Sequence, residues 1–253
     1  MIRAIFIKEQ LSFFRSPIAY VIGGLFTLVI GWMFFSHLTF FIDTVQKAPA
    51  STRHSYDFAN EVIIKIFGNV NFLLLFLVPI LTMKSFSEEF NKNTIDLFDT
   101  SPISDLELVL GKYLSVCFQG AVLILLTLIY PLLLSNLDLG DTTFVISGYM
   151  GLFLNLISFI SLGILASSIC LNSVISCLLG FVLNLFVWMF GWFGTLSSDY
   201  LVSEIFKFLS VNYHYQNFVN GSISISDISY YFSFITISLL CVCKRLEVRK
   251  WSS

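Results

Sequence analysis

Long uncharged runs alternate with short charged stretches along this chain. Five of these runs lie between Arg15 and Asp43, Lys65 and Lys84, Lys112 and Asp138, Asp141 and Asp199, and Asp227 and Lys244. A helix needs about 20 apolar residues to cross the hydrocarbon core of a membrane. The run after Asp141 is long enough for two crossings, with a turn at Asn172-Ser173. The pattern therefore predicts six spanning helices, at roughly Ile18–Phe41, Ile66–Met83, Tyr113–Ser135, Phe144–Leu171, Val174–Thr195 and Ile228–Cys243.

The composition agrees with this pattern and narrows the class of protein. Of the 253 residues, 57% are hydrophobic and 12% are charged, whereas about 25% are charged in a typical soluble domain. We therefore expect an all-α polytopic membrane protein, with residues 1–253 forming one transmembrane domain. The net charge of −2 gives no indication of a nucleic-acid partner, because in a membrane protein the placement of charge matters more than its sum.

The basic residues indicate an orientation. Six spans place both chain ends on the same side of the membrane, together with the charged stretch between the second and third spans. That side would carry Arg3, Lys8, Arg15, Lys84, Lys92, Lys112, Lys244, Arg245, Arg249 and Lys250, against Lys47, Arg53, Lys65 and Lys207 on the other. Loops rich in Lys and Arg stay in the cytoplasm, so we expect both termini there.

Two segments outside the spans have patterns of their own. Residues 1–16 mix apolar and basic positions, which fits either a helix lying on an anionic membrane surface or a basic flank that only sets topology. Pro17 then predicts a bend into the first span. The region Leu196–Asp227 keeps many aromatic residues, so we expect one or two short helices in the outer interface and a turn at Gly221.

Few polar side chains lie within the predicted spans. The notable candidates are His37, Gln119, Asn155 and Asn184, and we expect each to be hydrogen-bonded across helices. The five cysteines all lie in apolar runs without the spacing of a zinc site, so we expect them to pack as small apolar residues. We therefore expect no metal site and no cofactor in this chain.

The 84–112 segment, KSFSEEFNKNTIDLFDTSPISDLELVLGK, contains an unusually polar stretch between two spans. Ser85 followed by Glu88 fits a helix-capping box. Asn93-Thr94 predicts an interruption of the helix, and Thr100-Ser101-Pro102 predicts its end. Phe86, Phe90 and Leu97 fall near one helical face. An apolar face exposed on a cytoplasmic helix would be a docking surface for a partner protein.

The same segment resembles the core of ABC-2-type transporter permeases. The shared motifs are Lys84, Phe86, Glu88-Glu89, Thr94-Ile95-Asp96-Leu97-Phe98, Thr100-Ser101-Pro102-Ile103-Ser104 and Val109-Leu110-Gly111-Lys112-Tyr113. Asn93 replaces the usual Gly and Phe98 the usual Leu, and both keep similar physical properties. Further matches are Phe14-Arg15-Ser16-Pro17-Ile18 near the start, and Asn217-Phe218, Tyr230-Tyr231-Phe232 and Leu246-Glu247 near the end. This closing pattern is similar to gliding-motility-associated permeases of the GldF type.

The resemblance implies a permease of the bacterial inner membrane that pairs with a second, identical or different, permease among the membrane lipids. A separate cytoplasmic P-loop ATPase would bind ATP and drive export, or assembly of a gliding or surface apparatus. Residues Ser85–Thr100 would form the coupling helix, seated in a groove of that ATPase. The implied coupling residues are Phe86, Glu88, Glu89, Phe90, Thr94, Asp96, Leu97, Phe98 and Pro102.

Other functions are less well matched by the residues. The chain lacks the Gly-x-x-x-x-Gly-Lys-Ser/Thr sequence of a nucleotide-binding loop, so we expect it not to be an enzyme. An ion-coupled secondary transporter usually has an ionisable residue at mid-membrane, and we find none in the predicted spans. A membrane-embedded enzyme would need a paired nucleophile and base or a metal cluster. A non-transporting membrane scaffold remains an alternative.

Overall fold

The computed structural model describes residues 1–47, 49, 62–92, 94, 103–134, 143–196 and 199–252. The helices are α1 (Ile2–Arg15), α2 (Pro17–Lys47), α3 (Ile64–Thr82), α4 (Ser87–Asn91), α6 (Asp105–Leu126), α7 (Ile129–Leu134), α8 (Thr143–Ile169), α9 (Ser173–Leu196), α10 (Tyr200–Leu209), α11 (Val211–Val219) and α12 (Ile225–Ser252). The described residues contain no strand, so the all-α prediction is confirmed.

Six helices of the described part are long and apolar enough to cross a membrane, as predicted. They are α2, α3, α6, α8, α9 and α12, and each corresponds to one predicted span. Some of these helices extend beyond the apolar runs. The third span, for example, was expected from Tyr113, but α6 begins at Asp105. Charged residues therefore continue the helices beyond the apolar runs that reveal them.

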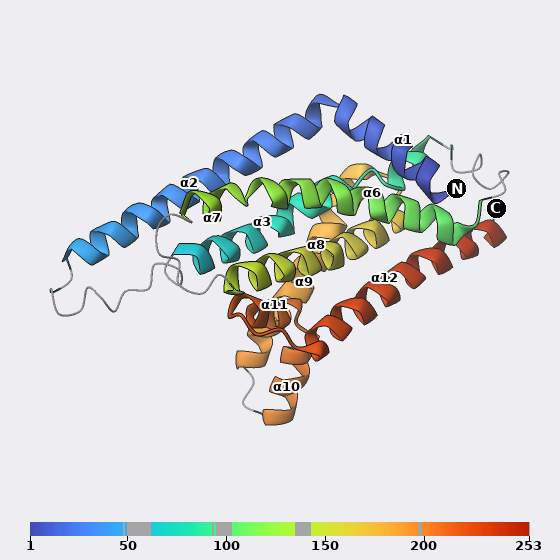
Figure 1. The fold of residues 1–253 in the computed structure, drawn as a ribbon. Helices are drawn as coiled ribbons and strands as arrows, with labels where there is room; N and C mark the ends of the chain where they lie inside the picture. Colours follow the sequence, from blue (N-terminus) through green and yellow to red (C-terminus); the bar gives the residue numbers. More distant parts are fainter. Residues whose placement is uncertain are drawn as a thin grey trace.

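The helix α8 lies at the centre of the bundle, in contact with α3, α6, α9, α11 and α12 (Figure 1). Its side chains Leu152, Leu156 and Phe159 have no exposed surface. Two glycines bring α3 close to α8, because a Cβ atom at Gly148 would overlap the Phe67 ring and one at Gly163 would overlap Thr82. Close approach at small residues is typical of helix packing in membranes.

The helices α1 and α2 form an elbow that leans on the bundle from one side (Figure 1). α1 ends at Arg15, Ser16 is extended, and Pro17 begins α2, which confirms the predicted bend. α1 packs on α6, where Gly111 lies so close to Ile5 that an added Cβ would be 3.0 Å from the Ile5 side chain. Gly111 therefore allows α1 and α6 to approach closely at this point.

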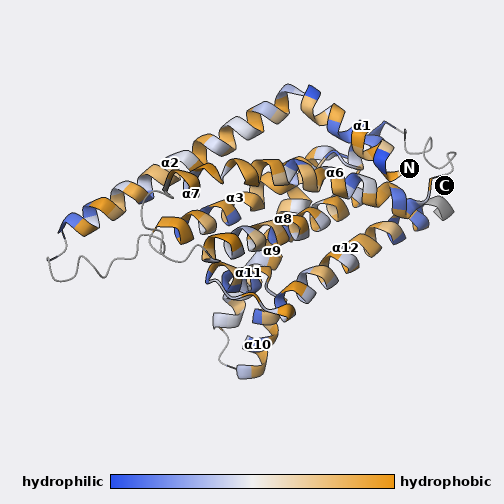
Figure 2. Ribbon diagram, viewed as in Figure 1, coloured by the Kyte–Doolittle hydropathy of each residue, from blue (hydrophilic) through white to orange (hydrophobic). Residues whose placement is uncertain are grey.

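Both termini lie at one end of the bundle, called the terminal end below (Figure 1). In Figure 2 the hydrophilic positions gather there, along α1 and at the adjoining ends of α6 and α12, while the middles of the spanning helices are hydrophobic. The short helices α10 and α11 lie at the opposite end (Figure 1). The prediction of short helices and a turn within Leu196–Asp227 is confirmed, while their place in the outer interface stays a prediction. Gly221 follows α11 with a φ of 82°, in the region that favours glycine.

The polar side chains within the spans follow the prediction in part. Asn155 donates to Asn71 across α8 and α3, and His37 bonds to Asn69 across α2 and α3 at 2.7 Å. Gln119 instead donates to Ser115 of its own helix at 3.5 Å. The prediction is wrong for Asn184, which is fully buried and whose amide oxygen and nitrogen have no hydrogen-bond partner among the described residues.

Candidate functional site

Four elements meet at the terminal end around the 84–112 segment. They are α1, the short helix α4 with the turn Met83–Phe86 before it, the first half of α6, and the last turns of α12. Lys112 is one of the ten basic residues that the sequence leads us to expect on the cytoplasmic side. The structure places its side chain inside this junction, with 2% exposed.

Lys112 links three parts of the chain through its ammonium group. It donates to the carbonyl oxygen of Ser85 at 2.5 Å, to Glu89 Oε1 at 2.8 Å and to Glu9 Oε1 at 3.3 Å. An ammonium group has three N–H donors, so all three are used. Lys8 lies near both carboxylates, 3.4 Å from Glu89 and 3.6 Å from Glu9. Two lysines and two glutamates thus form a neutral cluster that joins α1, α4 and α6.

The turn that leads into α4 is held by the central helices. Ser167 of α8 accepts hydrogen bonds from the backbone N–H groups of Phe86, at 2.9 Å, and Ser87, at 3.2 Å. The Ser87 hydroxyl donates to Ser173 at the start of α9, at 3.1 Å. The first N–H groups of a helix have no partner within that helix, and here a serine from another span supplies it. α4 is therefore fixed to α8 and α9 as well.

The apolar side of α4 is buried, and the expectation that it is exposed for a partner is wrong. Phe86 has no exposed surface and Phe90 is 6% exposed. The two rings stack at 6.2 Å, the Lys112 ammonium lies 5.1 Å from the centre of the Phe86 ring, and the Arg249 guanidinium of α12 lies 4.4 Å from that of Phe90. These phenylalanines hold α4 against its own bundle, because cation–π contacts and burial both favour that position.

The predicted capping box at Ser85 is also wrong. α4 begins at Ser87, Phe86 is its N-cap residue, and the cap has no side-chain hydrogen bond. The capping box occurs later, where Ser104 and Glu107 bond reciprocally at the start of α6. Both places match the Ser-x-x-Glu pattern. Ser104 has the extended backbone that an N-cap residue adopts, whereas Ser85 lies in the turn before α4.

The surface of α4 that remains open is polar. Glu88 and Lys92 form an exposed pair at 2.6 Å, with side chains 39% and 63% exposed. α4 ends at Asn91, which agrees with the predicted interruption, and the half-buried Thr94 donates from its backbone N–H to the Glu89 carbonyl oxygen at 3.0 Å. The remaining predicted site residues, Asp96, Leu97, Phe98 and Pro102, lie outside the described residues, as does the predicted helix end at Thr100.

A polar groove of about 590 Å³ opens between α1 and α4. It is lined by Lys8, Glu88, Glu89, Lys92 and Thr94, among others, and by Ile103 on the far side of the undescribed stretch. Its charges alternate in sign, so the groove suits a polar protein surface better than a single anion. The predicted coupling residues Glu88, Glu89 and Thr94 are thus brought together on one face, while Phe86 and Phe90 point away from it.

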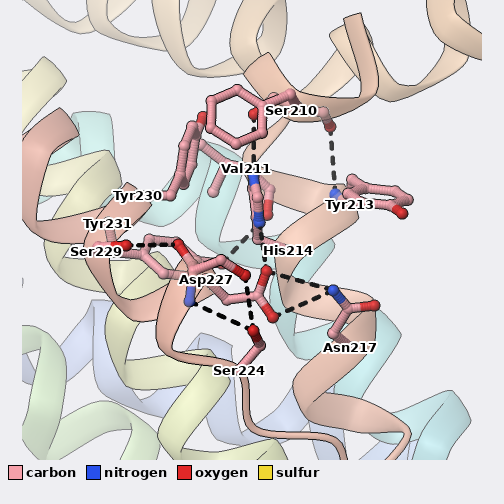
Figure 3. Close-up of polar contacts among 12 residues, drawn as sticks. Ser210, Val211, Tyr213, His214, Asn217, Ser224, Asp227, Ser229, Tyr230 and Tyr231 are labelled. Carbon is pink, nitrogen blue, oxygen red and sulfur yellow. Dashed lines mark hydrogen bonds and ion pairs between the residues drawn. The ribbon is translucent and has the colours of Figure 1, made fainter. Parts of the chain in front are cut away.

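A second buried polar cluster lies at the opposite end and ties α11 to α12 (Figure 3). His214 Nδ1 lies 2.6 Å from Asp227 Oδ1, its Nε2 lies 2.9 Å from the carbonyl oxygen of Phe208, and its ring stacks on Tyr230 at 4.0 Å. Asn217 donates to both oxygens of Asp227. Carboxylate and carbonyl oxygens both accept hydrogen bonds. These contacts hold the short helices in place.

Comparison with known proteins supports one family. The family model described as ABC-2 family transporter protein matches residues 3–243, which is nearly the whole chain. No curated protein matches the sequence.

Proposed function

The chain belongs to the ABC-2 family of transporter proteins and is a membrane permease of an ABC transporter, and we propose that a separate P-loop ATPase drives it through the 84–112 segment. The open face of α4, with Glu88, Lys92 and the adjoining groove, would contact that ATPase. ATP would be bound and hydrolysed by the partner, and this chain would supply the moving membrane part.

The observation that carries this proposal is the environment of Lys112. A segment that transmits force needs an open face for the partner and a firm attachment to the elements that must move. The Lys112 bonds join α4 to α1 and α6, and the serine contacts join it to α8 and α9. A partner can shift the permease only through contacts that differ between its own two states. Contacts at Glu88 would pass such a difference to these attached helices.

The remaining parts of the proposal follow from charge placement and from the sequence resemblance. We propose that the terminal end faces the cytoplasm of a bacterial cell, because the ten basic residues on that side favour a cytoplasmic location. We propose that the whole chain acts as one transmembrane domain beside a second permease, identical or different. The cargo would be a component of a gliding or surface-secretion apparatus, which rests on similarity of sequence pattern alone.

A pull-down of the tagged chain in mild detergent, followed by mass spectrometry, tests the proposal. We expect a P-loop ATPase in stoichiometric amount, and we expect Glu88→Ala combined with Phe98→Asp to release it. Lys47→Ala is the matched control, because Lys47 forms an exposed pair with Asp43 far along the chain from α4. Absence of any ATPase from the folded protein would overturn the proposal and favour a secondary transporter or a scaffold.

A further inference from the structure

Two cavities lie against the inner side of the α1–α2 elbow. One, of about 240 Å³, lies at the terminal end between α1, the turn before α4 and α6. The other, of about 190 Å³, lies deeper between α2 and α3. Ile22 and Ile80 line both cavities, so the two adjoin there. Together they are called the elbow groove below.

The deep part of the elbow groove is apolar throughout. Its lining residues are Ile22, Leu25, Phe26, Val29, Leu73, Phe76, Leu77 and Ile80. From Ser16 at the polar end to Val29, the groove follows about 13 residues of α2, or roughly 20 Å at 1.5 Å per residue. One leaflet of the hydrocarbon core is about 15 Å thick, half of about 30 Å. The groove therefore has the length of one acyl chain with its glycerol end.

The outer part of the elbow groove carries charges of both signs. Glu9 and Glu88 supply carboxylates, while Lys84 and Lys112 supply ammonium groups. Lys112 is engaged by Ser85, Glu89 and Glu9. Lys84 is exposed and has no hydrogen bond or ion pair to any residue that the structure describes. The Lys84 ammonium group is therefore available to pair with a bound phosphate.

The two carboxylates retain acceptor capacity for a cation. Glu9 bonds to lysines through Oε1, and Glu88 bonds to Lys92 through Oε1. A carboxylate has about four lone-pair sites on its two oxygens, so each can accept a further donor. Two acids and two bases line the cavity, which leaves no net charge to attract a purely anionic headgroup. The lining is complementary to a headgroup that has both a phosphate and an ammonium group.

We propose that the elbow groove binds one zwitterionic phospholipid of the phosphatidylethanolamine class. Its phosphate pairs with Lys84, its ammonium group meets the carboxylates of Glu9 and Glu88, and one acyl chain lies between α2 and α3. The acyl chain has apolar surroundings both in the groove and in the bilayer, so the gain over bulk lipid comes from the headgroup contacts. Selectivity for the headgroup is therefore the property to measure. Its headgroup end shares Glu88 with the proposed ATPase contact, but lipid binding by the purified chain is measured without an ATPase, so the two proposals are tested independently.

Native mass spectrometry of the purified full chain tests this site, with phosphatidylethanolamine or phosphatidylglycerol added in equal amount. We expect one retained phosphatidylethanolamine, bound at least tenfold more tightly than phosphatidylglycerol. Lys84→Gln should weaken that binding about tenfold, because it removes the partner of the phosphate. Lys84 is exposed, so the change leaves the fold intact. Lys207→Gln on α10 is the matched control and should bind as the unaltered chain does.

A second variant tests the apolar part of the groove. Leu77→Trp would fill the deep cavity, so we expect the retained lipid to be lost. Leu178→Trp on α9, at a residue that is 62% exposed, should keep it. Equal or tighter binding of phosphatidylglycerol would overturn the headgroup assignment. Unchanged binding in Lys84→Gln or Leu77→Trp, or complete displacement by soluble phosphoethanolamine, would overturn the site.

Discussion

Replacing Lys112 by Met is the sharpest test of the cluster at the terminal end. Methionine keeps an unbranched side chain but removes the ammonium group, which is 2% exposed and has three acceptors. The change leaves Glu89, 13% exposed, and Glu9, 24% exposed, facing only Lys8 at 3.4 and 3.6 Å. Two carboxylates would then share one exposed lysine.

Removing one partner of a buried ion pair costs about 3–5 kcal/mol. Lys8 still compensates part of the charge and Glu9 is partly hydrated, so we expect the lower end, a loss of about 3 kcal/mol in the free energy of unfolding. Adding Glu89→Gln to Lys112→Met removes one unpaired charge and should recover about 1 kcal/mol. Lys92→Met is the matched control, because its pair with Glu88 is exposed and contributes about 0.5 kcal/mol.

Reversible unfolding in mixed detergent micelles, followed by circular dichroism, measures these free energies. Each variant is compared with the unaltered chain at the same protein concentration. If Lys112→Met were no more destabilising than Lys92→Met, the buried cluster would not hold α4 to the bundle. If Glu89→Gln added its own loss in full to Lys112→Met, the two residues would not be coupled.

Three further changes test the packing around the same framework. Gly163→Ala should lower the free energy of unfolding by about 1–3 kcal/mol, because its methyl group would overlap Thr82 of α3. Gly24→Ala is the control: a Cβ atom there has no neighbouring atom within 4 Å, so the change should be neutral or stabilising in thermal unfolding. Ser167→Ala should speed hydrogen exchange of the first α4 amides, whereas Ser168→Ala, which loses only a bond within its own helix, should not; equal rates would contradict the capping role. His214→Phe leaves its buried carboxylate partner without the ring N–H and should cost about 3 kcal/mol in the same unfolding assay.

The spanning helices could be predicted because their signal is local. A run without charges identifies each span, and Pro17 and Asn172-Ser173 mark turns that the structure contains. Asn172 Oδ1 accepts from the Val174 N–H at 2.8 Å, so the turn before α9 is stabilised by its own side chain. Turns that are stabilised by neighbouring residues in this way can be recognised from a single sequence.

The site could be predicted only where its residues are neighbours in the chain. Glu88, Glu89 and Thr94 do lie together on one side of the junction. The partners of Lys112 could not be predicted, because Glu9 is 103 positions away and pairing at that distance leaves no periodic signal. The same holds for Ser167, which lies 81 positions from Phe86. Burial of Phe86 and Phe90 was missed for this reason, since an amphipathic face does not indicate whether its own bundle covers it.

Photo-cross-linking from position 88 tests the central claim most directly. A photo-reactive amino acid replaces Glu88, whose side chain is 39% exposed beside the polar groove, and a second protein has it in place of Lys207 on α10 at the opposite end. After irradiation in intact membranes, we expect a cross-link to a P-loop ATPase from position 88 and none from position 207. Cross-linking from position 207 instead, or from neither position in a folded protein, would contradict the claim that the 84–112 segment is the ATPase contact.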